Sequence, residues 1–383
     1  MMEFNKIKVA IYCATIFGGG ATVAVKNQQA NLCQATDCKV FSFREYNLFN
    51  KIIFSINRIV DRFVHIVFFS KNPIFHSSNF ISGCVPETLN VFNPDIVFVH
   101  WVSNGAISRK IIDKMPGKKI LVLHDSWWNC GFEHHPRLGI RSMRKFDQFI
   151  LKRKVRMLGQ FDYIIAPSMW QLHSFLSVYP DFTSKSHVIR NFFPIFDVRA
   201  SCYTDLFNIC CVGHNLLDDY HKGAEGVRAL IDFVDRNNIS CKITIIGRVK
   251  KQILKEFSCY SFLDFVGPLS NVEVLEQFSK ADIFCNFSEL ENYSYVNIEA
   301  QLCGAFLLTW NVGGNAETIV DKSCGLVLPF NDQGALFCSL IEIMNDLDNF
   351  RSTRISRIEL AARSFNNQDV LFQHLELIDE LLT

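Results

Sequence analysis

The chain has 383 residues, a length that predicts two domains, each large enough to bury a hydrophobic core. Hydrophobic residues make up 49% of the chain and charged residues 20%, which excludes the disordered and fibrous classes. The formal net charge of +1 argues against nucleic acid as a partner, yet this small value arises because large opposite charges in the two halves of the chain cancel. Residues 1–190 carry 24 Lys and Arg against 12 Asp and Glu, a net of +12, and residues 191–383 carry 15 against 26, a net of −11.

The first apolar run, residues 7–13, is expected to form a buried strand that leads into a glycine turn and a helix. Lys6 and Lys8, the apolar stretch and the small residues that follow also fit a signal peptide, which is the alternative. The longest uncharged runs, residues 9–25 and 300–316, are too short and too rich in glycine to cross a membrane, so no spanning helix is expected.

Short β-rich segments alternate with helical patterns along the whole chain, which predicts α/β doubly wound domains. The expected strands are residues 7–13, 96–100, 119–124, 163–167, 208–213, 242–247, 262–266, 283–286 and 306–309. We expect an N-terminal domain of residues 1–192, a linker of residues 193–205 and a C-terminal domain of residues 206–383, whose last helix is able to pack back on the N-terminal domain. Ligands should bind at the carboxyl ends of the strands, in a cleft between the domains.

The fourteen cysteines match neither a zinc pattern nor a disulfide framework, so we expect buried free thiols in a reducing cytosol. Cys130, His134 and His135 are ligand-type residues that stand close together in the sequence. Because no second pair of such residues lies nearby, no metal site is expected there.

Two glutamates, Glu291 and Glu299, are separated by seven residues, and a helix pattern begins between them. If residues 293–295 open that helix, its first N–H groups attract anions. A carboxylate accepts hydrogen bonds from neighbouring hydroxyls, so one glutamate near a sugar and one near a ribose would suit a sugar nucleotide. From the spacing alone, both could equally be capping or solvated helix residues.

This segment resembles the donor-binding signature of retaining GT-B glycosyltransferases of family 4. The matching residues are Ser288, Glu291, Glu299, Ala300, Cys303, Gly304, Gly313, Gly314 and Glu317. Further matches follow in the family's order over nearly the full chain, at residues 18–20, 93–101, 123–128, 164–170, 188–191, 212–223, 245–247 and 265–284. The resemblance implies two Rossmann-like domains that face a central cleft, and transfer of a sugar from a nucleotide sugar with retention of anomeric configuration.

The resemblance also implies a role for particular residues. Glu299 would bind the ribose hydroxyls and Glu291 the transferred sugar, and His124 would lie beside the reacting sugar. The remaining donor contacts are assigned to Gly19, Gly20, Val266, Gly267, Pro268, Asn292, Tyr293 and Ser294. His124 could instead cap its strand end through Asp125.

The diphosphate of the donor is expected to meet Lys222, whose ammonium suits the charge of a leaving group. The family's usual arginine in this loop is replaced by His214, and the arginine that often precedes the lysine is replaced by His221. Because a histidine is only partly protonated at neutral pH, Arg248 is a candidate substitute cation. The catalytic residues implied are His124, Lys222 and Glu291, with no metal and no cofactor besides a UDP- or GDP-linked sugar.

From residue 137 to residue 157 eight basic residues stand against one acidic residue, with apolar residues interleaved. This pattern predicts a basic amphipathic helix of the kind that lies on anionic lipid, and a solvated surface helix is the alternative. The predicted membrane contacts are Arg141, Arg144, Lys145, Lys152, Arg153 and Lys154. We therefore expect a cytoplasmic protein bound peripherally to the inner face of the plasma membrane, with a polyprenyl-diphosphate-linked oligosaccharide as acceptor in cell-surface polysaccharide (O-antigen or capsule) synthesis.

Two other functions compete with sugar transfer. A degenerate GT-B scaffold stays open because of His214. A GT-B nucleotide-sugar epimerase would need its own acid and base, which the sequence does not offer. A dinucleotide oxidoreductase is poorly supported, because residues 18–23 do not match the G-x-G-x-x-G pattern.

Overall fold

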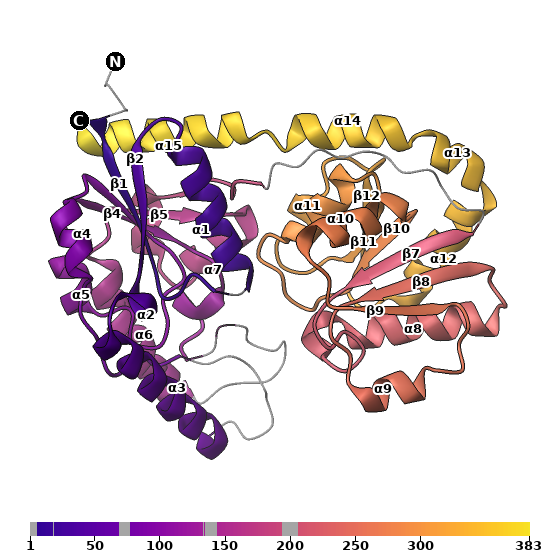
Figure 1. Ribbon diagram of the computed structural model, residues 1–383, viewed down its shortest axis with the longest axis horizontal. Coiled ribbons are helices and arrows are strands. Elements are labelled where there is room, and N and C mark those ends of the chain that lie inside the picture. Colours follow the sequence, from indigo (N-terminus) through magenta and orange to yellow (C-terminus); the bar gives the residue numbers. More distant parts are fainter. Residues whose placement is uncertain (1–5, 18, 69–76, 133, 135–143, 194–205) are drawn as a thin grey trace. The chain divides into compact units, whose positions relative to one another are not determined.

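The computed structural model describes residues 6–17, 19–68, 77–132, 134, 144–193 and 206–383. It forms two compact units, Met1–Pro194 with Asn367–Thr383, and Ile195–Asn366 (Figure 1). Among the described residues each unit is built around one parallel sheet of six strands. The predicted fold class, two Rossmann-like α/β domains, is confirmed. The predicted linker lies outside the described residues from residue 194 onward.

The sheet of the first unit has the strand order β2-β1-β3-β4-β5-β6. Its strands are β1 (Lys8–Cys13), β2 (Asp37–Ser42), β3 (Ile96–Val99), β4 (Lys118–Val122), β5 (Tyr163–Ala166) and β6 (Ser186–Val188). β3 and β5 are buried along their whole length, as expected for interior strands of a parallel sheet. The predicted strand at residues 7–13 is confirmed, because β1 pairs with both β2 and β3.

Helices connect these strands, because parallel strands need long crossovers. They are α1 (Gly19–Leu32), α2 (Phe43–Tyr46), α3 (Leu48–Phe68), α4 (Glu87–Phe92), α5 (Arg109–Lys114), α6 (Arg144–Leu158) and α7 (Met169–Leu176), with the 3₁₀ helices η2 (Ser126–Trp128) and η3 (Pro180–Lys185).

The last helix of the chain, α15 (Asn367–Leu382), belongs to the first unit. The Asn367 side chain accepts a hydrogen bond from the Phe193 amide (2.8 Å) and donates one to the Phe193 carbonyl (2.9 Å). His374 packs its ring against Phe98 and Phe192. These contacts join the two ends of the unit, residues 193 and 367, although 174 residues separate them.

The sheet of the second unit has the order β12-β11-β10-β7-β8-β9. Its strands are β7 (Phe207–Val212), β8 (Cys241–Ile246), β9 (Leu263–Gly267), β10 (Ile283–Asn286), β11 (Phe306–Trp310) and β12 (Gly325–Leu328). Its helices are α8 (Ala224–Arg236), α9 (Lys251–Glu256), α10 (Asn271–Lys280), α11 (Tyr295–Leu302), α12 (Gln333–Asn345), α13 (Leu347–Ser352) and α14 (Arg354–Ser364), with the 3₁₀ helices η4 (Tyr220–Lys222) and η5 (Ala316–Thr318).

A buried arginine, Arg354, fixes α14 to this unit. Its guanidinium donates to the carbonyls of Ser279 (2.6 Å), Ala281 (3.3 Å) and Cys303 (2.8 Å). These carbonyls lie at the C-terminal ends of α10 and α11, where a helix leaves its last acceptors without partners. One charged side chain therefore satisfies two helix ends that pack beneath the sheet.

The described cysteines are all free, and eight of the thirteen are buried. No helix within the described ranges is both long and apolar enough to cross a membrane.

Candidate functional site

Apart from Gly19 and Gly20, the residues that the sequence assigned to the donor lie at the ends of β7, β8, β9, β10 and β11 or in the loops and helix that follow them. All of these loops lie at the carboxyl edge of one parallel sheet, where α/β proteins bind ligands. Three of the loops meet at glycines. The Gly247 amide donates to the Gly267 carbonyl (2.8 Å), and Gly247 lies so close to Gly213 that a Cβ at residue 247 would be 2.2 Å from the Gly213 carbonyl oxygen.

An ion pair stands at this edge. Lys222 Nζ lies 3.0 Å from Glu291 Oε1, and the side chains are 42% and 21% exposed. The negative charge of Glu291 raises the pKa of Lys222, so the ammonium stays charged across the physiological range. The structure thus brings together two residues that are 69 positions apart in the sequence, one assigned to the diphosphate and the other to the sugar.

Local backbone geometry fixes both partners of this ion pair. Lys222 ends η4, whose first residues are capped by Asp219, and the chain then turns at Gly223 with φ +82°. A Cβ at Gly223 would lie 2.1 Å from the Phe287 carbonyl oxygen, so only glycine fits. On the other side, Gly313 has φ +58° and a Cβ there would lie 2.0 Å from the Glu291 carbonyl oxygen. The glycine pair of the sequence motif therefore packs directly on the backbone of Glu291.

A buried polar network lies beneath the loop and was not predicted from the sequence. The Asn286 amide donates to Asn297 Oδ1 (2.7 Å), and the Asn297 amide donates to Thr318 Oγ1 (2.9 Å). Gln301, one turn after Asn297 on α11, donates to the Thr318 carbonyl (2.6 Å). These bonds join the end of β10, the first turns of α11 and η5. The signal in the sequence was a pair of amide residues at i and i+4 in a mostly apolar helix.

The helix α11 begins at Tyr295, within the range that the residue pattern gave for its start, with Ser294 as its N-cap residue. The Ser294 hydroxyl makes no capping hydrogen bond to the helix, and it accepts one from Asn286 instead (3.3 Å). A helix start without a side-chain cap leaves backbone N–H groups for another acceptor. The side-chain amide of Asn292, just before this start, is covered and makes no hydrogen bond within the described residues.

Glu299 lies on α11, half-buried, and its carboxylate makes no hydrogen bond within the part of the chain that the structure describes. Burial raises the pKa of this carboxyl to about 7. A carboxylate in such a place gains from hydroxyl donors, and two neighbouring hydroxyls of a ribose would supply them. Glu299 and Glu291 thus have different surroundings, one paired with a cation and one not.

Two candidate cations, His214 and Arg248, lie in the loops that follow β7 and β8. His214 and Arg248 are both exposed, and they stand in adjacent loops that are joined because the Asn215 amide donates to the Arg248 carbonyl (2.8 Å). Val266 and Gly267 end the next strand, β9, and Pro268 follows it. Gly267 has φ +74° and open space on the side where a Cβ would stand.

In the first unit His124 forms part of a chain of hydrogen bonds. His124 Nε2 lies 2.8 Å from His100 Nδ1, and His100 Nε2 lies 2.5 Å from Gln28 Oε1. Burial lowers the pKa of His100 and lowers that of His124 to about 4, so both rings are neutral at pH 7. Since Gln28 Oε1 only accepts, His100 carries its proton on Nε2, and His124 donates to His100 from Nε2.

Asp125, through which His124 was alternatively expected to cap its strand end, is the N-cap residue of η2. Asp125 accepts from the Trp127 amide (2.9 Å), and its other oxygen lies 2.5 Å from His134 Nδ1. His134, considered above as a metal ligand, is thus occupied by Asp125, and His135 lies outside the described residues. His100 was missed, although it follows β3 much as His124 follows the neighbouring strand β4.

Gly19 and Gly20 open α1, and both are exposed with no atom near the position of a Cβ. Gly19 has φ +77°, a conformation that favours glycine. The predicted close approach of a ligand to this turn is therefore sterically open, while Gly18 lies outside the described residues.

One predicted membrane contact is wrong. Lys154 is buried, its Nζ donates to the carbonyls of Trp127 and Gly131, and it lies 3.8 Å from the centre of a Trp127 ring. This buried position lowers its pKa, and the lysine is an internal bridge that cannot reach lipid. Arg153 is half-buried and bonds the Asn79 carbonyl (3.3 Å). Lys145 and Lys152 are exposed, Arg141 lies outside the described residues, and so does the side chain of Arg144.

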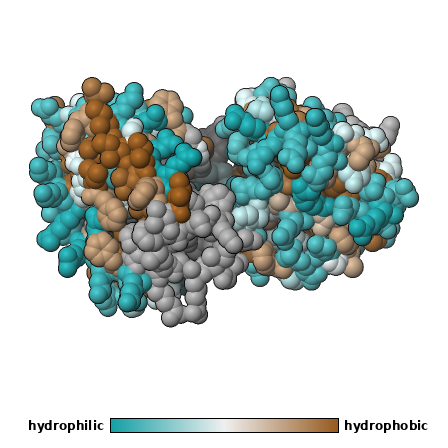
Figure 2. Space-filling view, turned by 90° about the horizontal axis from the view of Figure 1, so that it is seen from below, coloured by the Kyte–Doolittle hydropathy of each residue, from teal (hydrophilic) through white to brown (hydrophobic). Residues whose placement is uncertain are grey.

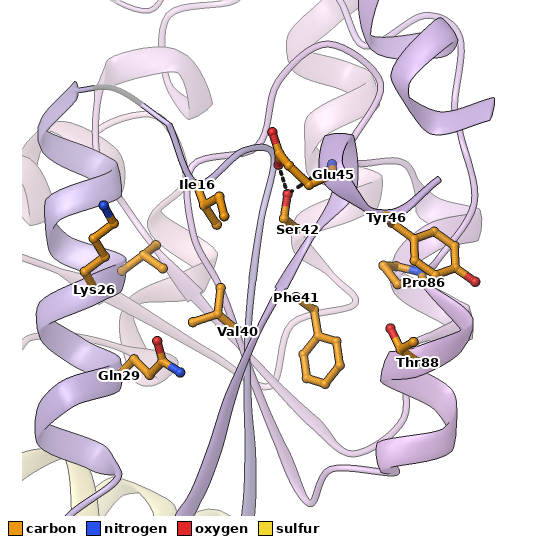
Figure 3. A pocket seen from close by; sticks show the side chains of 11 residues that line it. Ile16, Lys26, Gln29, Val40, Phe41, Ser42, Glu45, Tyr46, Pro86 and Thr88 are labelled. Carbon is orange, nitrogen blue, oxygen red and sulfur yellow. Dashed lines mark hydrogen bonds between the residues drawn. The ribbon is translucent and has the colours of Figure 1, made fainter. Parts of the chain in front are cut away.

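A pocket with a cavity volume of about 360 Å³ lies over the edge strand β2 of the first unit (Figure 3). Its walls are mostly apolar, and its acidic residue, Glu45, bonds Ser42 and accepts from the Thr15 hydroxyl (3.0 Å). None of the residues predicted to bind the donor lines this pocket. The pocket is therefore separate from the residues that were predicted to bind the donor.

The C-terminal unit resembles known glycosyltransferases in sequence. Residues 217–357 match the family described as glycosyl transferases group 1. The matched range includes Lys222, Glu291 and Glu299. The glycogen synthase of Mycobacterium tuberculosis is 26% identical over 133 residues, a stretch that spans 33% of this chain and 32% of that protein. The chain thus matches about a third of the length of this curated relative.

Solved structures show the same fold over the whole chain. HepE of Anabaena, solved in complex with UDP, has a TM-score of 0.64 at 14% identity and covers 98% of this chain and 100% of its own. Sucrose-phosphate synthase of Thermosynechococcus elongatus has a TM-score of 0.68 at 15% identity, with 98% and 99% covered. A glycosyltransferase of Rickettsia africae has a TM-score of 0.65 at 14% identity, with 99% and 100% covered.

Proposed function

We propose that the protein is a glycosyltransferase that moves a sugar from a nucleotide-sugar donor to an acceptor hydroxyl with retention of anomeric configuration. The observation that carries the proposal is the carboxyl edge of the second sheet. There a paired ammonium, a half-buried carboxyl without a hydrogen-bonding partner and an uncapped helix start lie within the segment that matches glycosyl transferases group 1.

In this proposal the bond between the anomeric carbon and the leaving phosphate oxygen breaks, and a bond to the acceptor oxygen forms on the same face. Lys222 and the start of α11 balance the negative charge that develops on the leaving diphosphate, with Arg248 or His214 as a second cation. The acceptor proton passes to the leaving phosphate oxygen. Glu291 binds the transferred sugar and orients Lys222, and Glu299 binds the ribose hydroxyls. His124 is neutral and its Nε2–H donates to His100, so its Nδ1 accepts a hydrogen bond from a hydroxyl of the reacting sugar.

The donor is proposed to be UDP- or GDP-linked. UDP-sugars are the first to test, because HepE has been solved with UDP and with UDP-glucose. Because the leaving charge is met by side chains and a helix end, activity is expected to persist in excess EDTA.

The acceptor is proposed to be a polyprenyl-diphosphate-linked oligosaccharide at the inner face of the plasma membrane, in the synthesis of a cell-surface polysaccharide. The net charge of +12 on residues 1–190 supports this part, because diphosphate groups and anionic headgroups are both negative.

A thermal-shift panel of UDP-, GDP- and dTDP-sugars tests the proposal, followed by assay of nucleotide release. One nucleotide class is expected to raise the melting temperature of the wild-type protein and of Glu276→Ala, an exposed control on α10. Glu299→Ala is expected to lose this response. A panel in which no nucleotide stabilises the wild type would favour the scaffold alternative, and recovery of an epimerised free donor would favour the epimerase.

A further inference from the structure

The helix α3 exposes a continuous apolar stripe. Its members follow one another at intervals of three and four residues, which places them on one side of a helix. Their exposed fractions run from 37% to 70%, and they are Phe49, Ile52, Ile56, Ile59, Phe63 and Ile66, with Leu48 beside them at 72%. Figure 2 shows the corresponding hydrophobic patch on the first unit. Patches of this kind mark sites of interaction with a protein or a membrane.

The opposite side of α3 is held in place by polar contacts. Asn50 donates to the Cys84 carbonyl (2.9 Å), and Asn57 donates to the Ile81 carbonyl (2.8 Å). Asp61 accepts from the amide (3.0 Å) and the hydroxyl (2.5 Å) of Ser78. A rotation that buried the apolar stripe would leave these buried polar groups without partners, which is costly. The stripe therefore faces outward because of its neighbours.

The exposed charged residues of α3 are all basic. Lys51, Arg58 and Arg62 are exposed along one edge of the stripe, and the single acidic residue of the helix, Asp61, is buried. The helix α6, whose Arg153 bonds Asn79 in the segment that α3 also binds, exposes Lys152 and likewise buries its single acidic residue. A second copy of this surface would bring like charges together. An anionic lipid surface would provide the opposite charge and accept the apolar side chains.

We propose that α3 is the membrane-docking element of this protein, lying in the interface of an anionic bilayer with its apolar stripe among the acyl chains. Arg58 and Arg62 then reach the phosphates of the headgroups. This proposal names the element through which the peripheral membrane association of the proposed function would occur. It rests on the proposed function only for the reason why the protein would bind a membrane. α6 serves as a secondary electrostatic contact through Lys145 and Lys152.

The test is co-sedimentation of the full-length protein with phosphatidylcholine vesicles, with and without phosphatidylglycerol. Wild type is expected to bind only vesicles that contain the anionic lipid. Ile59→Ser with Phe63→Ser is expected to lower binding at least about tenfold. The matched control is Ile355→Ser with Phe372→Ser, which alters two apolar residues of similar exposure on α14 and α15 and should bind as wild type does. Equal binding by both double variants would overturn the proposal.

Hydrogen exchange of the wild-type protein provides a measurement that depends on no variant. Added anionic vesicles are expected to slow exchange in peptides of α3, and protection confined to α6 would contradict the proposal. So would a wild-type dimer in solution that the double variant at residues 59 and 63 converts to a monomer. The double variant is expected to keep the rise in melting temperature that a nucleotide induces, because docking and donor binding use different residues. A wild-type protein that no nucleotide stabilises would refute the proposed function and would leave the docking proposal standing.

Discussion

Glu299 offers a sharp test, because its surroundings predict opposite effects on stability and on donor binding. Burial raises the pKa of its carboxyl from 4.5 to about 7. The folded protein therefore holds the proton more tightly than the unfolded chain does. The stability that this provides is complete below pH 4.5 and is lost as the pH rises to about 7.

The magnitude follows from the shift. An increase of this size corresponds to about 3 kcal/mol when the carboxyl is ionised, and partial exposure of the side chain reduces it to about 2 kcal/mol. Glu299→Gln removes the ionisation and keeps the shape. The variant is expected to be more stable than the wild type by about 2 kcal/mol at pH 8, or roughly 4–8 °C in melting temperature, and nearly equal to it at pH 5.

Donor binding is expected to change in the opposite direction. Ribose hydroxyls donate more strongly to a carboxylate than to an amide, so Glu299→Gln should weaken the affinity for the nucleotide about tenfold at pH 8. Urea unfolding at pH 5 and pH 8 and calorimetric titration of the nucleotide measure both effects, with Glu276→Gln as the control. A Gln variant with unchanged stability at pH 8 would show that Glu299 is not desolvated. Unchanged affinity would show that it does not bind the donor.

Three further predictions test other parts of the structure. Lys222→Met is expected to lower the rate of nucleotide release about 10²- to 10³-fold, because the ammonium no longer balances the charge of the leaving diphosphate. Little stability should be lost, because the pair with Glu291 is partly open to water. A rate loss of tenfold or less would show that Lys222 has no catalytic role. Gly313→Ala is expected to lower the free energy of unfolding in urea by more than about 2 kcal/mol, because the new Cβ would lie 2.0 Å from a carbonyl oxygen. In the control Gly159→Ala the nearest atom is 3.8 Å from the Cβ, so the free energy of unfolding should change little. Equal effects of the two substitutions would contradict the geometry. Burial lowers the pKa of His374 to about 4, so the stability from its neutral ring is complete above about pH 6.5 and is lost as the pH falls to about 4. In His374→Leu the loss of stability over that pH range should be smaller by about 2–3 kcal/mol. Acid unfolding curves of the variant that coincide with those of the wild type would refute this.

The strands show how far a hydrophobic pattern predicts a sheet. The interior strands of both sheets were found from the sequence, because an interior strand is covered on both faces and reads as an apolar run. The strands that were missed, β2, β6 and β12, all lie at the edge of a sheet. β2 alternates with polar residues (Asp37–Ser42), and β6 and β12 have only three and four residues, so their patterns are too weak to separate from a loop; the edge strand β9 was found.

The candidate donor site was predictable as a set of residues, and the contacts between those residues were not. The spacing of Glu291 and Glu299 and the glycine pair after β11 identify the segment, because each residue type is tied to a local backbone conformation. The pairing of Lys222 with Glu291 depends on how two loops fold over one sheet edge. The same is true of the hydrogen bonds that join Asn286, Asn297 and Thr318.

The sequence alone determined the α/β architecture and the basic character of the first half, since both follow from residue type and spacing. Only the tertiary structure decided which faces are covered. Lys154 is charged yet lies inside, because carbonyls and an aromatic ring surround it. Four isoleucines of α3, at positions 52, 56, 59 and 66, are apolar yet lie outside, because Asn57 and Asp61 bind the neighbouring segment. Periodicity shows which residues share a face, and the partners of that face determine whether it meets protein, lipid or water.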